Sequence, residues 1–515
     1  MRKIRHYFIR ILLLFTAAAI ALAAFFACSR ESATDSSAPD ASIAEESSEE
    51  ALTKSFGSYE EAEEAIYELR RTRFENGAYD RAAVASFEDA CSDAVMYLRH
   101  NTEDEDYLQK CYELYEKMIA ARDAVDYLRG DEMRVYINVN GTVREDRYSK
   151  CTVSFVDKEG GGIPSCKDTS ALIRVRGNST AGADKKPYNI KLSADMRVLG
   201  MESGSKWALL ANHFDKTLIR NELAFYLASA AGGYAAPDSR FAEVYLNGKL
   251  IGSYLVCEPV TDGKHRADID TGAGDFIAER VKAWAPGAQD TVTTRELGLR
   301  FDIEYAADIK KARSVLNAAE QAILSGDEER IRACVDVDSF AAMYVVHELL
   351  KDCDLTYGST YICCKNGVLF FGPVWDMDLS AGNVSDIHPE EKYYIYNNVY
   401  PFGDGSGDSA SGLWARQEWL EKLYNAPFFA ELVKEKYASL TPVIEDLYAE
   451  GGYIDTLVNL HGAAFERNYN DAGWDIGSHA SPYESRTAYG SYTQAVEELK
   501  DWLERRHSFL KKEFE

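Results

Sequence analysis

The sequence predicts an α+β fold, because the spacing of its apolar residues changes along the chain. From about residue 133 apolar and polar residues alternate, which is typical of strands. From about residue 306 apolar residues recur at helical spacing, and "STYICCKNGVLFFG" (359–372) interrupts them with a predicted strand pair. A chain of 515 residues is long enough for two or three domains.

Short strands joined by Gly and Asn turns are predicted between residue 133 and about residue 305. The clearest is the hairpin "FAEVYLNGKLIGSYLVCEPV", with Asn247 and Gly248 at its turn. The segment "SKWALLANHFDKTLIRNELAFYLASAAGG" (205–233) predicts a helix that ends at paired glycines. Further strands are predicted in "RVYINVNG", "CTVSFVDKEG", "ALIRVRGNST" and "PYNIKLS".

Residues 57–130 predict a small helical module. Ser58 precedes Glu61 by three positions, which is the capping-box spacing at the start of a helix, and apolar residues then follow at helical spacing. The segment carries no recognisable chemistry. We interpret it as a packing or spacer module.

The net charge of −27 argues against two classes of partner. Nucleic acids and anionic membrane surfaces both require clustered Lys and Arg. The ten cysteines include no C-x-x-C pair, so they give no support for a zinc site, and their spacing predicts no disulfide framework. Cys363 and Cys364 are adjacent in a predicted strand and should point to opposite faces.

The N-terminus has the form of a secretory signal peptide. Four basic residues precede an apolar run that ends in "FFACS", and residues 1–27 are the predicted signal. A small residue before Cys28 resembles the lipobox of bacterial lipoproteins, although Phe25 stands where that pattern prefers Leu. Lipidation at Cys28 would place the chain on the outer face of the cell membrane; the alternative is an uncleaved anchor. Residues 28–56, rich in Ser, Ala and Glu, predict a solvated tether.

A basic hairpin stands out in this acidic chain. "LIRVRGNSTAGADKKPYNIKL" places five cations around one turn: Arg174, Arg176, Lys185, Lys186 and Lys191. Such a cluster beside a Gly/Ser turn suits a polyphosphate. The alternative is a set of ion pairs with the abundant carboxylates.

Two carboxylates follow the second strand of the 359–372 pair. In "GPVWDMDLSAGN", Asp376 and Asp378 are at positions i and i+2, which point the same way in an extended segment and could face one divalent cation. A pair of solvated turn aspartates is the alternative. Upstream, "DLTYGS" resembles the kinase catalytic loop D-L-x-x-x-N, with Asp354 in the base position and Ser359 in place of Asn.

Taken in order, these motifs resemble the CotH family of spore-coat-protein-H-like atypical kinases. The resemblance covers roughly residues 133–515 and includes the closing "LKDWLERRHSFL". It implies a divergent two-lobed protein-kinase-like fold over 131–515, with a β-rich N-lobe (131–305) and a mainly helical C-lobe (306–515). It also implies ATP, Mg²⁺ or Mn²⁺, and transfer of the γ-phosphoryl group to Ser or Thr of a secreted or coat-type protein.

The resemblance also implies roles for individual residues. Asp354 would orient the acceptor hydroxyl, and Asp376 would bind the metal, with Asp378 and Ser359 as further ligands. The expected nucleotide contacts are Arg176, Lys186, Lys191 and Glu258. Asp215 and Arg220 also match the family, but a structural ion pair explains them equally well.

Two other functions remain open from the sequence. One is a surface protein on the same fold that binds a glycan or protein partner through the aromatic loop "PEEKYYIYNNVYPFGDG" and transfers no phosphate. The other is a metal-dependent glycosyltransferase, since D-x-D after a strand also binds nucleotide sugars.

Overall fold

The computed structural model describes the residues that carry the predicted fold, in several segments. These are 55–70, 81–104, 106–123, 133–156, 166–177, 179–264, 266–281, 290–352, 355, 358–384, 418–478 and 488–514. The predicted signal peptide, the lipidation site Cys28, the tether up to residue 54, Asp354 and the aromatic loop at 389–405 lie outside them. Among the described residues, no helix is both long and apolar enough to cross a membrane.

Three helices occupy the segment after residue 54: α2 (Tyr59–Arg70), α3 (Arg81–His100) and α4 (Tyr107–Asp123). They bury their own apolar cluster, which includes Ile66 and Leu98. The predicted cap is present at the start of α2, where the Glu61 N–H donates to Ser58 Oγ and Glu61 Oε2 accepts from the Gly57 N–H.

The alternating segment forms a closed barrel with the strand order β1-β2-β3-β4-β5-β7-β6. Each strand turns alternate side chains into the barrel, and Val135, Ile173, Ile190 and Trp207 are among those that fill it. Closure leaves the barrel without free sheet edges. Its strands are β1 (Arg134–Val139), β2 (Ser149–Val156), β3 (Cys166–Val175), β4 (Tyr188–Met196), β5 (Gly204–Leu210), β6 (Ser239–Leu246) and β7 (Lys249–Cys257), with the short helix α5 (Ser179–Gly182) between β3 and β4.

The predicted hairpin is β6–β7. Leu246 pairs with Lys249, and the turn residues Asn247 and Gly248 both have positive φ, as a two-residue hairpin turn of this kind requires. The long helix predicted over 205–233 is only partly correct. Its first residues form strand β5, and helix α6 begins at Arg220 (Arg220–Ala231) and ends at Gly232 in the left-handed conformation.

A second sheet has the order β12-β11-β8-β10-β9. Its strands are β8 (Phe276–Val281), β9 (Thr291–Thr293), β10 (Arg300–Glu304), β11 (Thr360–Lys365) and β12 (Val368–Phe371), and the 3₁₀ turn η2 (Thr271–Ala273) precedes β8. The boundary between two lobes that was expected near residue 305 remains a prediction. Strand pairing crosses it, because β8 lies before residue 305 and pairs with β11, which lies after it. Cys363 and Cys364 point to opposite faces, as expected: Cys363 packs against Ile277 and Cys364 joins the large core.

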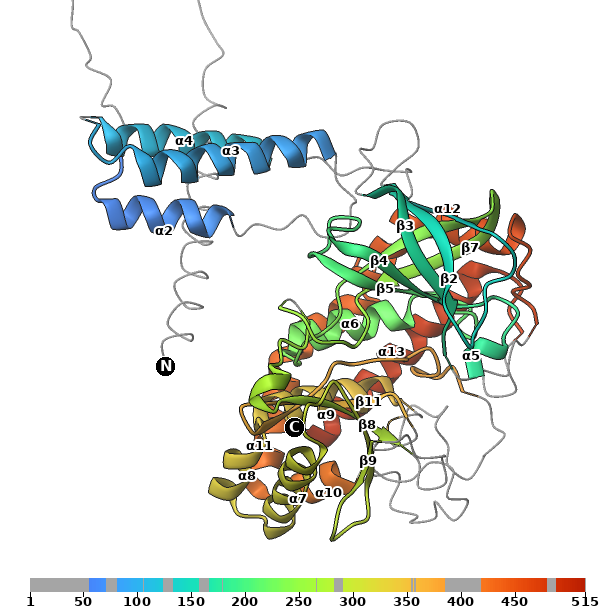
Figure 1. Ribbon diagram of the computed structural model, residues 1–515. Coiled ribbons are helices and arrows are strands. Elements are labelled where there is room, and N and C mark those ends of the chain that lie inside the picture. Colours follow the sequence, from blue (N-terminus) through green and yellow to red (C-terminus); the bar gives the residue numbers. More distant parts are fainter. Residues whose placement is uncertain are drawn as a thin grey trace, which may run out of the picture. The chain divides into compact units, whose positions relative to one another are not determined.

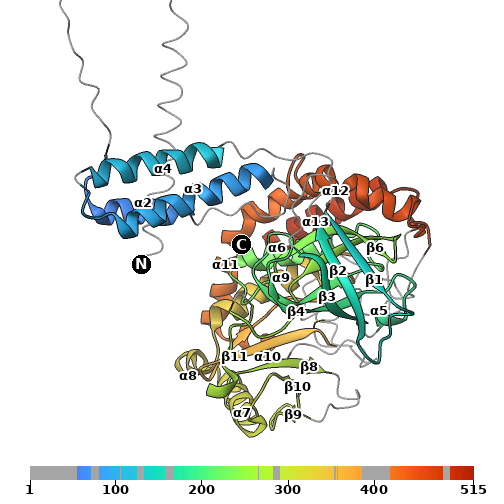
Figure 2. The same ribbon diagram turned by 45° about the horizontal axis from the view of Figure 1, so that its top comes forward.

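Helices pack against the second sheet and against the barrel. In Figure 1 and Figure 2 the two groups of strands are separate, with α6 and α9 between them. One continuous core joins barrel residues such as Leu255, sheet residues such as Phe301, and the buried helix α9. The helices are α7 (Ile309–Ser325), α8 (Glu328–Cys334), α9 (Val337–Leu350), α10 (Glu418–Tyr424), α11 (Pro427–Tyr448), α12 (Tyr453–Asn470) and α13 (Tyr492–Phe514). The predicted α+β class is confirmed: β1–β7 form a closed barrel, and β8–β12 form the second sheet.

Candidate active site

The loop that follows β12 carries the two predicted metal-binding aspartates. Its backbone is not extended as the sequence argument assumed, because Asp376 has φ 61°. The two carboxylates are therefore not aligned as i and i+2 of a strand. Asp378 is buried, and its main-chain oxygen accepts from Asn383 Nδ2 at 2.6 Å. Solvated turn aspartates do not describe this pair, because neither side chain is exposed.

Asp376 and Ser359 lie together, as the kinase-like pattern requires. Ser359 Oγ donates to Asp376 Oδ2 at 3.1 Å, and the Ser359 N–H donates to Glu279 Oε1 at 2.9 Å. Ser359 also has a positive φ, 57°. A non-glycine residue in this region costs roughly 1–3 kcal/mol and persists only where its surroundings hold it. Two such residues that hydrogen-bond to each other mark this point as constrained.

Arg176 approaches Asp376 from the end of β3. Its guanidinium lies 4.9 Å from the ring centroid of Trp375, the residue before Asp376. Burial raises the pKa of the Asp376 carboxyl, and the nearby Asp352 carboxylate raises it further. The Arg176 charge and the Ser359 hydrogen bond oppose that rise. A bound cation would favour the charged form in the same way.

The loop before β11 brings a second acidic group near Asp376. Asp352 is buried, and its Oδ2 lies 3.1 Å from Nδ1 of His347, in the last turn of α9. Asp352 lies two residues after the end of α9. The predicted catalytic residue Asp354 falls outside the described residues, so its role stays a prediction.

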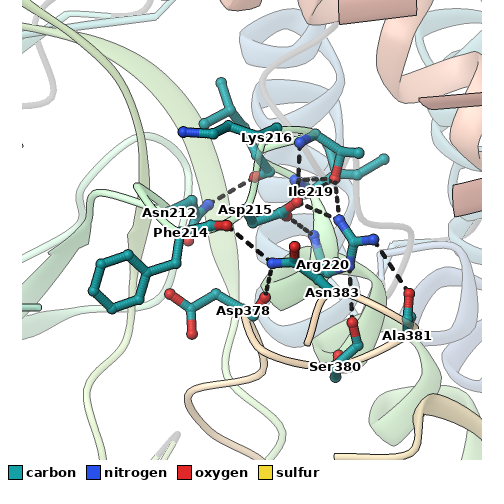
Figure 3. Close-up of polar contacts among 12 residues, drawn as sticks. Asn212, Phe214, Asp215, Lys216, Ile219, Arg220, Asp378, Ser380, Ala381 and Asn383 are labelled. Carbon is teal, nitrogen blue, oxygen red and sulfur yellow. Dashed lines mark hydrogen bonds and ion pairs between the residues drawn. The ribbon is translucent and has the colours of Figure 1, made fainter. Parts of the chain in front are cut away.

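A buried polar network holds the loop after β12 in place (Figure 3). Arg220, the first residue of α6, pairs with Asp215 at 2.5 Å. Its Nε donates to the main-chain oxygen of Ser380 at 2.9 Å, and its Nη2 donates to that of Ala381 at 3.2 Å. Asn383 Nδ2 also donates to the Phe214 oxygen at 2.9 Å. Asp215 and Arg220 form an ion pair, and this pair also positions the loop that carries Asp376 and Asp378.

The predicted lysines lie in different environments. Lys186 donates from Nζ to the Ala181 oxygen at 2.8 Å. Lys185 is fully buried and donates to the oxygens of Ala211 and Ser253, and burial lowers its pKa well below the usual value. Lys191 is exposed on β4. Hydrogen bonds to main-chain oxygens, rather than ion pairs with carboxylates, thus hold Lys185 and Lys186.

Lys191 shares its face with a lysine that the sequence argument missed. Lys191 pairs with Lys206 across β4 and β5, and directly opposed residues of antiparallel strands point to the same side. Lys206 Nζ lies 3.2 Å from both Thr261 Oγ1 and the Tyr305 hydroxyl. This outer face of the barrel is therefore directed toward the segment after β7 and the end of β10. Lys206 could not be singled out from sequence, because it lies within a segment that was predicted to be helical.

Acidic residues on the second sheet face the same region and were also missed. Glu279 on β8 pairs in register with Asp302 on β10, so both point to one face, and Glu304 lies two residues further along β10. Burial raises the pKa of Glu279, and Glu304, Asp376 and Asp302 raise it further. Burial also raises the pKa of Glu304, and the Lys206 charge opposes that rise. The alternation of polar and apolar residues in "RFDIEY" (300–305) was the sequence signal that could have identified Asp302 and Glu304.

Glu258 follows β7 and lines a small pocket. The pocket is bounded by residues of the β7 exit and by Pro373 of the loop after β12, and its interior volume of about 10 Å³ is close to the minimum that one water molecule needs. The Glu258 side chain is 6% exposed, with Oε1 at 3.7 Å from Arg266 Nε. Burial raises the pKa of Glu258 to about 7. Its predicted nucleotide contact stays a prediction.

The available donors suit a hard divalent cation. Asp376, Asp378 and Ser359 offer oxygen ligands, and Mg²⁺ is commonly held by one or two carboxylates together with substrate phosphates and water. Within the described segments, no group of three or more His, Cys, Asp or Glu side chains forms a metal cage. The paired oxygen donors of Asp376 and Ser359 fit a metal that a nucleotide helps to hold.

The chain matches a known protein family over about two thirds of its length. The family that matches the chain is CotH, described as the CotH kinase protein, and the match covers residues 173–510. This range includes the barrel from β3 onward, the second sheet, and the loops that carry Ser359 and Asp376. The comparison with curated proteins returned no match.

Proposed function

Since the chain belongs to the CotH kinase protein family, we propose that it is a metal-dependent kinase of divergent two-lobed fold. In this proposal it transfers the γ-phosphoryl group of ATP to Ser or Thr of extracellular or coat-type proteins. The observation that carries the proposal is the contact between Asp376 and Ser359, from the two loops that the kinase-like pattern pairs.

The proposed division of labour follows from chemistry. Phosphoryl transfer depends on positioning and on neutralising charge more than on covalent help from the protein. Asp376, with Asp378 and Ser359, would hold Mg²⁺ or Mn²⁺, which would neutralise the phosphate charge. Arg176 and Lys191 would contact the phosphates, and Asp354 would orient the acceptor hydroxyl.

The proposed location follows from the N-terminal sequence alone. Removal of residues 1–27 and lipidation of Cys28 would tether the chain to the outer face of the bacterial cell membrane. The lipid would then be its only membrane contact, and residues 28–56 would separate the folded part from the bilayer.

Phosphoryl transfer and nucleotide binding can be tested separately. We expect the full chain to phosphorylate itself with labelled ATP and Mn²⁺, and Asp354→Ala to lower the rate by about a hundredfold or more while ATP still binds. Asp376→Asn should abolish metal-dependent ATP binding in isothermal titration. Glu435→Gln, at an exposed position of α11, is the matched control for a lost carboxylate. Unchanged metal-dependent binding in Asp376→Asn would refute the metal assignment.

One observation favours a second function, a surface binding protein on the same fold. The Lys186 ammonium group is already bonded to the Ala181 oxygen, so it is a poor phosphate ligand in this conformation. A binding protein would take up ATP or a partner without any labelled phosphate appearing on protein. Equal background labelling in the wild type and in Asp354→Ala would select this function.

A further inference from the structure

We propose that the outer face of the barrel over β2 and β3 binds acidic side chains of the protein substrate, so that the acceptor Ser or Thr belongs to an extended acidic segment of a separate protein. The inference rests on the proposed function, because it concerns the substrate of the same transfer. It adds the chemical class of the acceptor segment and the residues that would recognise it.

A row of paired residues crosses the outside of the barrel. Lys150 of β2 pairs with Leu172 of β3, and Leu172 pairs with Lys191 of β4. Lys191 in turn pairs with Lys206 of β5. Paired residues point to the same side, and Ile173, the neighbour of Leu172 on β3, points into the barrel core instead. The row is therefore on the outside, and at about 4.8 Å per strand it spans about 14 Å, the length of about four extended residues.

Arg174 adds a further cation to this face, because it lies two residues after Leu172 on β3. Its guanidinium carbon lies 5.0 Å from the ring centroid of Tyr148, an exposed residue just before β2. In the described part of the chain, Arg174 Nε is buried without a hydrogen-bond acceptor. Native proteins rarely leave a buried donor unpaired, so a carboxylate from a bound chain would complete this contact.

The cations of this face lack internal partners, although the chain is strongly acidic. Its net charge is −27, and elsewhere on the barrel Arg134 pairs with the buried Glu243 at 3.3 Å. Among the described residues, no carboxylate lies within ion-pair distance of Lys150 or Lys191. Their charges therefore remain available to a partner of opposite sign.

The face leads from open surface to the candidate active site. At its inner end Lys206 Nζ lies 3.2 Å from the Tyr305 hydroxyl, just after β10 of the second sheet. Arg176, at the end of β3, acts electrostatically on Asp376. At the outer end Lys150 is exposed. The nucleotide phosphates would occupy the inner end, and acidic side chains of the substrate would occupy the outer end.

The test is the binding of three labelled peptides to the full chain, measured by fluorescence anisotropy. Each peptide has one central serine, flanked by glutamates, by glutamines or by lysines. We expect the glutamate peptide to bind about tenfold more tightly than the glutamine peptide at low salt, because several exposed charge pairs act together. The difference should shrink at roughly 0.5 M NaCl, since salt screens exposed charges. The net charge of the chain favours the lysine peptide, so a preference for glutamate requires a local basic surface.

Charge reversal locates the surface. Lys150→Glu should reduce the preference for the glutamate peptide from about tenfold to about twofold or less. Lys249→Glu is the matched control, because Lys249 is an exposed strand lysine beside the β6–β7 turn, three strands away from β2 in the barrel. It should keep the wild-type preference. Both variants should bind ATP and Mn²⁺ with wild-type affinity in isothermal titration, which also shows that they are folded.

The outcomes separate this inference from the proposed function. If the glutamate peptide binds through Lys150 but labelled ATP leaves no phosphate on its serine, the face binds acidic segments and the kinase proposal fails. If all three peptides are phosphorylated equally and bind equally, the kinase proposal stands and the docking proposal is wrong. Tightest binding of the lysine peptide, or no peptide binding, also overturns it. Binding to phosphatidylglycerol vesicles that Lys150→Glu abolishes, without binding of the glutamate peptide, would assign the face to a membrane and overturn it as well.

Discussion

Two buried ion pairs have similar geometry, yet the structure gives them different tasks. Asp215 and Arg220 are 1% and 5% exposed, and Glu348 and Arg506 are both fully buried. The N–O distances, 2.5 Å and 2.6 Å, are nearly the same. The chemistry of the two pairs is therefore matched.

The difference lies in where the remaining guanidinium donors go. Arg220 donates to main-chain oxygens of the loop that carries Asp376 and Asp378. Arg506 donates from Nε and Nη2 to the main-chain oxygen of Glu348, so it anchors α13 to α9 inside the core. Burial of an ion pair does not by itself indicate a functional role. The role is indicated by the groups that the pair holds in place.

Breaking the core pair should have the largest effect on stability. Arg506→Ala leaves the Glu348 carboxylate buried without its main partner, which typically costs about 3–5 kcal/mol. Urea unfolding followed by circular dichroism measures the change. The fraction that remains folded should bind ATP and Mn²⁺ with wild-type affinity. A loss of affinity larger than the loss of folded protein would contradict the separation of the two pairs.

Arginine-to-lysine changes separate the roles of the two ion pairs, because they keep the positive charge and remove the additional donors of the planar guanidinium group. Arg220→Lys loses the donors to Ser380 and Ala381, and two charge-assisted hydrogen bonds are together worth about 3 kcal/mol. The loop after β12 would then be less constrained, so Mn²⁺-dependent ATP affinity should fall by about tenfold or more.

Arg506→Lys is the matched control for that change. It should lower the free energy of unfolding by a similar amount without changing nucleotide affinity. If Arg220→Lys changes only stability, Arg220 has no positioning role and the two pairs are equivalent.

A third pair extends the comparison to a loose contact. Glu258 and Arg266 are buried but 3.7 Å apart. The pKa of Glu258 rises to about 7 from a usual value of 4.5, because burial outweighs the distant charge. The folded state therefore binds the proton more tightly than the unfolded state. This contribution to stability is complete below pH 4.5 and is lost as the pH rises through 7, a loss of about 3 kcal/mol.

Comparison with Glu258→Gln isolates that contribution. The amide does not titrate, so the difference in unfolding free energy between wild type and variant should drift by this amount between pH 4.5 and pH 8. A difference that is constant over the range would mean that Glu258 stays ionised in the folded protein.

The sequence predicted the elements that depend on local pattern. The β6–β7 hairpin follows from alternation around Asn247 and Gly248, and the β11–β12 pair follows in the same way from its Asn-Gly turn. Strand β5 was predicted as helix because Trp207 and its neighbours are buried on both faces, so they show no alternation. A short apolar run of this kind does not distinguish a buried strand from a helix.

The site was harder to predict because its geometry depends on long-range contacts. The motif identified Asp376 and Ser359, but not their positive φ angles, which depend on partners such as Glu279. Arg220 matched the family without revealing its contact with a loop 160 residues away. Lys206 and Glu279 became visible only once strand pairing set their faces.

The smallest effect is expected at the arginine next to Arg506. Arg505 pairs with Asp501 one turn earlier on α13, with N–O distances near 3 Å, but both side chains are about half exposed. In water such a pair gains little attraction and loses side-chain freedom, so Arg505→Ala should change the free energy of unfolding by less than about 0.5 kcal/mol. Urea unfolding beside Arg506→Ala measures both. If the neighbouring arginines cost the same, burial does not decide the worth of an ion pair in this protein, and the distinction between Arg220 and Arg506 would rest on their backbone contacts alone.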